Sequence, residues 1–322
     1  MEEATYIGLT CAFAVMFLTD VIGNSLVITV VLRHRSMQTP MNYLLVNLAV
    51  ADMMVAVFIS IQFIFNPLYT HPEGTTGVVL CKLITGGAVA WTSAVTSVLN
   101  LVAISVERYY AILYPHSEKG RITNRKLKYI ISGSWMAALL WNAPLFIAVT
   151  YRYDIKTCGE VWPNQDLPKI YSFGWNVVVG AIPMSVMGYM YIKVIRALWF
   201  KSDTTTQQAI IRTRKRVTKM VIAVSIIYVI CWTPTLVIYF LSYMLPDEGI
   251  HSTKHQISIV LATFNSSINP VIYSLQSTGF RKYLCEMVCC GKSCITDNRI
   301  DDEVLANQEN PVNGQDTQET PA

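Results

Sequence analysis

Residues 42–66 read NYLLVNLAVADMMVAVFISIQFIFN, an apolar run with one charged residue, Asp52. A helix needs about 20 apolar residues to cross a hydrocarbon core about 30 Å thick. Seven such runs follow one another, at residues 6–32, 42–66, 80–112, 129–149, 170–198, 216–244 and 256–276. Of the 322 residues, 52% are hydrophobic and only 14% are charged, too few to coat a soluble domain. The sequence therefore predicts an all-α fold, a seven-transmembrane helix bundle.

The basic residues indicate which ends of these runs face the cytosol, because short cytosolic loops carry an excess of Lys and Arg. The connections after the first, third and fifth runs, with the segment just after the seventh, hold 17 Lys and Arg residues, from Arg33 to Lys282. The other connections hold five, namely Lys82, Arg152, Lys156, Lys169 and Lys254. We expect a multi-pass plasma-membrane protein with an extracellular N-terminus and a cytoplasmic C-terminus. The net charge of +4 reflects this topology and does not indicate nucleic-acid binding.

The segments outside the runs are short. Residues 1–5 are expected to form a short extracellular N-terminus, and residues 6–276 the bundle. Residues 277–294 begin amphipathically and continue with several cysteines, which predicts a short eighth helix followed by a Cys-rich juxtamembrane segment. Residues 295–322 are polar, acidic and poor in aromatic residues, a composition that predicts a disordered cytoplasmic tail.

The cysteines outside the runs or at their ends fall into two groups. Cys81 and Cys158 lie on the expected extracellular side, where a disulfide between them is chemically available. The other group lies just inside the membrane, where palmitoylation is the usual fate and free cytosolic thiols are the alternative. It consists of Cys285, Cys289, Cys290 and Cys294.

Polar side chains inside the runs carry a functional signal, because each costs free energy unless it has a partner or a task. Asp52 is the clearest case. Several oxygen ligands around one carboxylate suit a hard monovalent cation, and a neutral, hydrogen-bonded carboxyl group is the alternative. Asp20 stands four residues before Asn24, on the same helical face. It either joins the Asp52 cluster or is held neutral by a neighbouring helix. The candidates to face Asp52 are Asn24, Ser97, Asn100, Asn265, Ser266 and Asn269.

The third run ends in Glu107-Arg108-Tyr109 at the cytosolic boundary. An acid beside an arginine can hold the guanidinium in one rotamer, and loss of that pairing frees five donors for a partner. Pro234 in the sixth run and Pro270 in the seventh each remove a backbone hydrogen bond and kink a helix. These features indicate a bundle whose cytosolic ends can swing, the kind of bistable element that signalling requires.

Seven motifs, one set per run and in order, resemble the signature positions of rhodopsin-like G-protein-coupled receptors, over about residues 6–290. They are Gly23-Asn24, Leu48-Ala49-Val50-Ala51-Asp52, Glu107-Arg108-Tyr109, Trp135, Pro183 with Tyr191, Cys231-Trp232-Thr233-Pro234 and Asn269-Pro270-Val271-Ile272-Tyr273. The resemblance implies a sodium ion as an allosteric ligand of the resting state, and no required cofactor. Its ligands would be Asp52, Ser97, Asn265, Ser266 and Asn269.

The resemblance also implies a switch that meets a G protein. Its residues would be Glu107, Arg108, Tyr109, Tyr191, Asn269, Pro270 and Tyr273. A Cys81–Cys158 disulfide would hold the second extracellular loop on the third span, and Trp232 would lie under the ligand. Cys81 stands 27 positions before Arg108, a longer interval than the family usually has. The outer part of the third span is therefore expected to be longer or bulged.

The class of ligand is less constrained. Residues 83–106 contain no Asp or Glu for an amine, and residues 256–276 contain no Lys for a retinal Schiff base. A small peptide, a lipid or another small molecule remains. The stretch Glu107-Arg108-Tyr109-Tyr110-Ala111-Ile112 is similar to neuropeptide receptors of the RFamide, neuropeptide Y and galanin groups, and eight expected extracellular acids against five bases favour a cationic peptide. Candidate pocket residues are Gln62, Trp91, Trp175, Trp232, Tyr239 and Gln256.

These features favour a receptor over an enzyme or a transporter. An enzyme would need a nucleophile–base pair or metal ligands, but all five histidines lie in loops or at the ends of runs. A transporter would show paired broken helices in its two halves. The expected function is to bind an extracellular peptide and activate a heterotrimeric G protein, with arrestin and membrane lipids as further partners. A receptor for a lipid or other small molecule is the alternative, and a seven-helix transporter the remote one.

Overall fold

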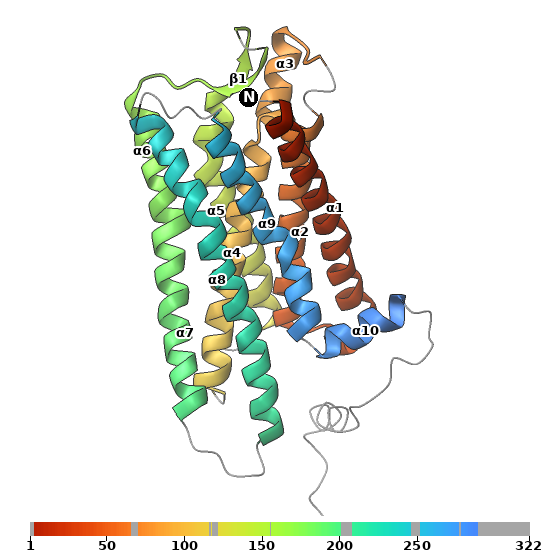
Figure 1. The fold of residues 1–322 in the computed structure, drawn as a ribbon. Helices are drawn as coiled ribbons and strands as arrows, with labels where there is room; N and C mark the ends of the chain where they lie inside the picture. Colours follow the sequence, from red (N-terminus) through yellow and green to blue (C-terminus); the bar gives the residue numbers. More distant parts are fainter. Residues whose placement is uncertain are drawn as a thin grey trace, which may run out of the picture.

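The computed structural model describes residues 3–65, 70–115, 117, 122–154, 156–200, 208–245, 252–276 and 278–288. Long helices run side by side in one elongated bundle, and the short helix α10 lies across one end of it (Figure 1). The elements are α1 (Glu3–Arg33), η1 (Arg35–Met37), α2 (Pro40–Ser60), η2 (Ile61–Phe65), α3 (Gly74–Leu80), η4 (Cys81–Thr85), α4 (Ala88–Leu113), α5 (Asn124–Ala148), β1 (Val149–Arg152), β2 (Thr157–Glu160), α6 (Asp166–Trp175), η5 (Asn176–Ala181), α7 (Ile182–Phe200), α8 (Gln208–Met244), α9 (Thr253–Gln276) and α10 (Thr278–Val288).

Six helical spans in the described part of the chain are long and apolar enough to cross a membrane. They are Ala4–Arg33, Pro40–Phe65, Gly74–Leu113, Asn124–Ala148, Asp166–Leu198 and Lys215–Met244. The seventh span is α9, which is less apolar because it carries several Ser and Asn side chains, and which packs against α1, α2 and α8. The predicted seven-helix bundle with a short eighth helix, α10, is confirmed.

The third span lies at the centre of the bundle. In its most apolar stretch 67% of the residues are buried, against 28% in α1 and 22% in α5. A helix with such a buried surface must satisfy its polar groups inside the protein, because lipid offers no hydrogen bonds. The polar residues of α4 are therefore placed to interact with neighbouring helices.

The boundaries differ from the predicted ones at several places. Residues 3–5, expected to precede the first span, are already helical, and α8 begins at Gln208, eight residues before its predicted start. The predicted tail, residues 295–322, lies outside the described residues. The all-α prediction contained no strand, but β1 and β2 form an antiparallel hairpin in which Tyr151 pairs with Cys158.

The outer part of the third span is irregular, as the long interval between Cys81 and Arg108 suggested. A π-helical turn, η4, follows α3, and Gly86 and Gly87 separate it from α4. Gly87 has φ +83°, a left-handed conformation that favours glycine. A Cβ on Gly86 would lie 2.2 Å from Cγ1 of Val149 and 2.4 Å from the carbonyl oxygen of Cys81. The two glycines thus let the hairpin pack closely on this turn.

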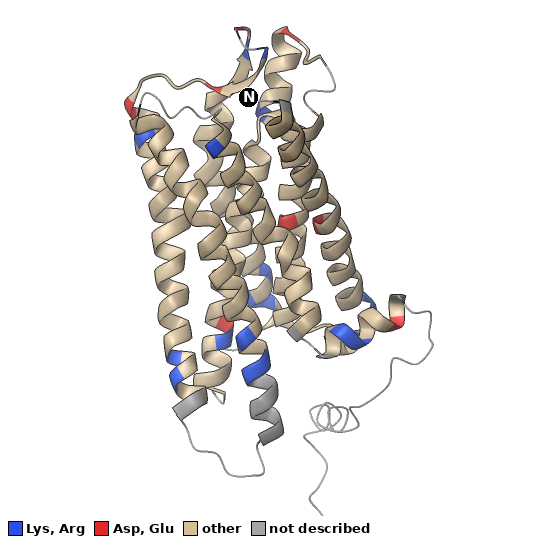
Figure 2. Cartoon of the chain, viewed as in Figure 1, with Lys and Arg blue, Asp and Glu red and all other residues tan. Residues whose placement is uncertain are grey.

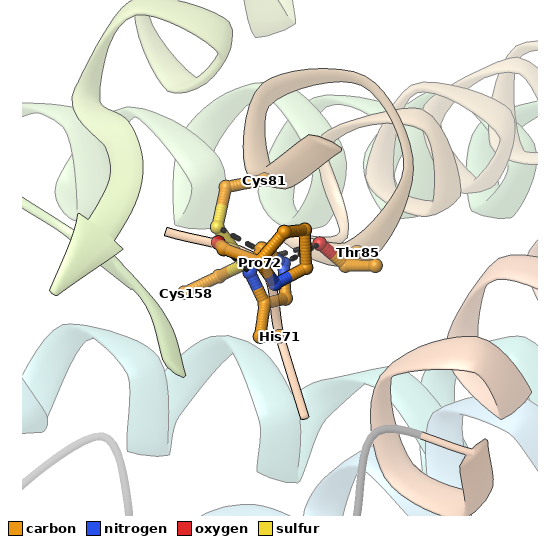
Figure 3. The surroundings of a disulfide bond; sticks show 5 residues. All are labelled: His71, Pro72, Cys81, Thr85 and Cys158. Atoms are coloured by element: carbon orange, nitrogen blue, oxygen red, sulfur yellow. Dashed lines mark hydrogen bonds between the residues drawn. A yellow bond between two sulfur atoms is a disulfide. The ribbon is translucent and has the colours of Figure 1, made fainter. Parts of the chain in front are cut away.

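A disulfide joins Cys81 in η4 to Cys158 in β2, with 5.5 Å between the two Cα atoms. His71 lies against the bridge, with Nε2 at 3.6 Å from Sγ of Cys81 and 3.4 Å from Sγ of Cys158 (Figure 3). The hydroxyl of Thr85 lies 3.0 Å from the same nitrogen. The bridge therefore fixes the hairpin and the residues before α3 over one end of the bundle, here called the disulfide end. The opposite end, with Arg108 and α10, is called the Arg108 end.

Replacing Cys81 by Ala should sharply reduce the amount of folded protein at the cell surface. The bridge spans 77 residues, and removal of a native disulfide typically costs about 2–4 kcal/mol. Surface biotinylation and the unfolding temperature of the purified protein measure the effect. Cys11→Ala, an exposed cysteine on α1, is the control and should change neither. An unchanged unfolding temperature for Cys158→Ala would contradict this role of the bridge.

Candidate functional site

A cavity of about 380 Å³ opens into the bundle below the β1–β2 hairpin. All six residues that the sequence suggested for a ligand pocket line it, although their binding of a ligand stays a prediction. The walls come from η2, α4, α5, the hairpin, α6, α8 and α9. Among the lining residues are Gln62, Trp91, Glu160, Trp175, Trp232, Tyr239, Tyr243, His255 and Gln256.

Aromatic rings form the deeper wall of the cavity. The ring of Trp91 packs edge-on against Trp175 at 6.0 Å and against Trp232 at 6.4 Å between centroids. Tyr239 continues the wall, with its ring 6.5 Å from that of Trp175. Edge-to-face pairs are a preferred arrangement of aromatic rings. The wall is therefore a rigid surface on which apolar, aromatic or guanidinium groups can stack.

Glu160 brings a carboxylate to this cavity. The hydroxyl of Tyr243 donates to Oε2 at 2.5 Å, the indole N–H of Trp162 at 2.8 Å and the hydroxyl of Tyr239 at 3.3 Å. Burial raises the pKa of Glu160 above its usual range, and these hydrogen bonds limit the rise. The three donors are neutral, so they orient the carboxylate without cancelling its charge.

The sequence did not indicate Glu160 as a cavity residue, and it stood only among the expected extracellular acids. The available signal was its spacing from Cys158. Residues two apart in a strand point to the same face. The disulfide that holds Cys158 over the bundle therefore also directs Glu160 toward the bundle. Arg152, on the paired strand, lines the cavity as well and forms an ion pair with Asp154.

The Asp52 cluster joins three helices in the middle of the bundle. Oδ1 of Asp52 accepts hydrogen bonds from Ser97 on α4 at 2.8 Å and from Ser266 on α9 at 3.0 Å. Oδ2 accepts one from the amide of Asn269 at 2.8 Å. The buried side chain of Asn265 is not part of this set, and its Oδ1 has no hydrogen-bond partner in the described residues.

The residues around Asp52 fit a sodium ion in their chemistry. A carboxylate and two hydroxyl oxygens are hard donors, and Oδ1 of Asn269 is buried without a hydrogen-bond partner among the described residues. Asn100, another sequence candidate, instead accepts a hydrogen bond from Asn47 at 2.8 Å. Asn47 in turn accepts one from the indole of Trp135 at 3.0 Å. This second network ties α2 to α4 and α5, next to the cluster.

Arg108 forms an ion pair with its neighbour Glu107 at the end of α4. Their side chains are 16% and 15% exposed, so the pair is largely shielded from solvent. The hydroxyl groups of Tyr191 on α7 and Ser225 on α8 form a hydrogen bond of 2.8 Å. The buried hydroxyl of Tyr273 has no hydrogen-bond partner among the described residues. Arg108 is thus held by Glu107, and no hydrogen bond joins it to Tyr191 or Tyr273 in the described part of the chain.

Two other suggested switch residues lie on α4 and α9, and one suggested lipidation residue lies on α10. The ring of Tyr109 packs against that of Tyr110 at 5.3 Å, and Pro270 lies inside α9. Cys285 lies on α10, and its palmitoylation stays a prediction. The other suggested lipidation sites, Cys289, Cys290 and Cys294, lie outside the described residues.

Comparison with known proteins gives several peptide receptors as relatives. The chain is 30% identical over 311 residues to the Tachykinin-like peptides receptor 86C of Drosophila melanogaster, across 90% of this chain and 60% of that protein. It is 30% identical over 302 residues to the Neuropeptide FF receptor 1 of Rattus norvegicus, across 84% and 68% of the two chains. It is also 30% identical over 285 residues to the Substance-P receptor of Homo sapiens, across 84% and 68%.

The family model described as "7 transmembrane receptor (rhodopsin family)" matches residues 23–273. This range runs from the first helix, at Gly23, to Tyr273 in α9, and so contains the Asp52 cluster, the Glu107–Arg108 pair and the cavity. Together with the apolar spans, the match describes a multi-pass membrane protein. The chain belongs to the rhodopsin family of seven-transmembrane receptors.

Proposed function

We propose that the chain is a cell-surface receptor that binds a small peptide at the disulfide end and activates a heterotrimeric G protein at the Arg108 end. The cavity lined by aromatic residues and by Glu160 is the observation that carries the proposal. The relatives are named as peptide receptors, which supports the ligand class. Arrestin and membrane lipids are further partners that a receptor of this topology would meet.

The disulfide end faces outward in this proposal. Disulfides form in oxidising compartments, and the Cys81–Cys158 bridge lies at this end. Lys and Arg gather toward the opposite end of the bundle (Figure 2), as the excess of basic residues on the cytosolic side predicts. The N-terminus is then extracellular and the C-terminus cytoplasmic.

Glu160 selects a cationic group in the ligand. A partly buried carboxylate whose hydrogen-bond partners are neutral gains free energy when a cation reaches it. The neighbouring rings of Trp91, Trp175 and Tyr239 offer faces for a guanidinium or an aromatic side chain. A peptide end with an arginine or amine beside an aromatic residue would satisfy both features.

Trp232 connects the ligand to the switch. Its ring lines the cavity and contacts Trp91, and Pro234 lies two residues further along α8. A ligand that displaces the Trp232 ring would change the kink at Pro234 and swing the Arg108 end of α8 outward. That motion opens space for the G protein beside Arg108. Arg108 then leaves Glu107 and contacts the G protein.

A screen of amidated peptides in cells expressing the chain tests the proposed function, with G-protein activation as the readout. At least one cationic peptide should activate the wild type. Arg108→Ala should then lose signalling and keep peptide binding, because it lies at the opposite end from the cavity, whereas Tyr239→Ala should weaken binding itself. Activation by a lipid or an amine and by no peptide would contradict the peptide assignment.

The charge of Glu160 should matter more than its shape. Glu160→Gln should weaken binding of a cationic peptide by about 10-fold or more, since a hydrogen bond to a charged group is worth about 1.5–3 kcal/mol. Asp166→Asn, which removes an exposed acid, is the matched control and should bind normally. Equal losses for the cationic peptide and for an analogue with citrulline in place of arginine would argue against charge recognition.

Asp52 should make agonist binding depend on sodium. A cation held between α2, α4 and α9 stabilises the resting packing of these helices, so agonist affinity should fall when sodium replaces choline at constant ionic strength. Asp52→Asn, which keeps the shape and removes the charge, should abolish this dependence. If the wild type binds agonist equally in both salts, the Asp52 cluster is only a polar part of the core.

A further inference from the structure

Asp20 on α1 is fully buried in a part of the bundle that crosses the membrane. Two contacts show which helix packs against the face of α1 that carries Asp20. Ser267 on α9 donates to the carbonyl oxygen of Met16 at 3.2 Å, and a Cβ on Gly23 would lie 2.8 Å from Cγ of Pro270 on α9. Residues 16, 20 and 23 share one face of a helix. Asp20 therefore points toward the segment of α9 that also holds Ser266 and Asn269.

The Asp52 cluster lies at the same height in the bundle. The hydroxyl of Ser25 on α1 reaches the sulfur of Met53 on α2 at 3.8 Å, so α1 meets α2 directly beside Asp52. Figure 2 shows one acidic position on α1 and one on α2 at about the same height, halfway along the bundle. The two carboxyl groups thus lie on adjacent helices at the same height, which favours the alternative in which Asp20 joins the Asp52 cluster.

Three acceptor atoms at this site lack a donor among the described residues. Asn24 donates its amide N–H to Oδ1 of Asp20 at 2.7 Å, and Asn269 donates to Asp52. This leaves Oδ2 of Asp20, Oδ1 of Asn24 and Oδ1 of Asn269 buried without a hydrogen-bond partner among the described residues. Asn24 and Asn269 are 0% and 1% exposed. Buried acceptors without a donor or a cation are costly.

The facing helices supply no basic side chain at this height. Residues 16–27, 48–56, 93–101 and 262–270 contain no Lys, Arg or His. Two carboxylates in a medium of low polarity repel each other and lose hydration, so a proton or a cation must offset their charge. A single sodium ion would compensate one of the two charges and leave the other.

We propose that Asp20 is a second carboxylate ligand beside Asp52 and that the pair binds a divalent cation of the calcium type in competition with sodium. Calcium takes six to eight oxygen ligands from carboxylates, amide carbonyls and water in flexible geometry. The site offers both carboxylates, the free amide oxygens of Asn24 and Asn269, and the hydroxyl of Ser97. The proposal rests on the cation-binding role proposed for Asp52. It adds a second charged ligand, Asp20, and a preference for a divalent cation.

Calorimetric titration and thermal unfolding of the purified receptor, without any agonist, test this site. In choline buffer the wild type should bind calcium with measurable heat, and its unfolding temperature should rise with calcium, because a ligand of the native state stabilises it. Asp20→Asn should weaken calcium binding by about 10-fold or more, since affinity follows the number of charged ligands. The same variant should keep a rise in unfolding temperature with sodium, which needs Asp52 alone.

Asp166→Asn removes an exposed acid and is the control for calcium bound at the surface; it should behave as the wild type. Asp52→Asn should lose the response to both cations. No heat and no temperature shift with calcium in the wild type would overturn the proposal, as would an unchanged calcium response in Asp20→Asn. A response to sodium alone in the wild type would reject the role of Asp20 and leave the sodium site of Asp52 standing. A wild type that responds to neither cation would reject both.

Discussion

The carboxyl group of Asp52 lies inside a bundle that crosses a membrane, where a charged or unpartnered group is costly. Three helices meet this constraint together, because Ser97, Ser266 and Asn269 all donate to the same two oxygens. The adjacent Asn47–Asn100–Trp135 network extends the connection to α5. The packing of α2, α4 and α9 is therefore specified by polar contacts, in a solvent where apolar contacts with lipid and with protein are nearly equivalent.

The two ends of the bundle are built differently around this centre. At the disulfide end, a covalent bridge and a hairpin hold Glu160 and the aromatic wall in fixed positions, as recognition of a ligand requires. At the Arg108 end, two adjacent side chains of one helix form the ion pair, and such a pair is easily exchanged for another partner. Proline-containing helices join the ends, and in the proposed mechanism they carry a change at Trp232 to Arg108 without a continuous chain of polar contacts.

Hydropathy predicted the seven spans because the hydrocarbon core sets both the length and the composition of a helix that crosses it. It missed the hairpin, since residues 149–160 lie outside that core and follow other rules. The spacing between Cys81 and Arg108 indicated an irregular third span, but its form depends on the close approach of Val149 to Gly86. The sequence placed Asp20 and Asn24 on one helical face. That α9 packs against this face was seen only from the contacts of Met16 and Gly23. Glu160 was missed because its direction depends on strand pairing and on the disulfide.

Linkage between the two ends tests the central claim of this structure, that the cavity and the Arg108 end are parts of one two-state element. Coupling of binding free energies is reciprocal. The affinity of an activating peptide for the purified receptor in nanodiscs should therefore rise when nucleotide-free G protein is added, by about 10-fold on the scale of typical allosteric couplings. It should return to its starting value when a guanine nucleotide releases the G protein. The same peptide affinity with and without a bound G protein would contradict the claim.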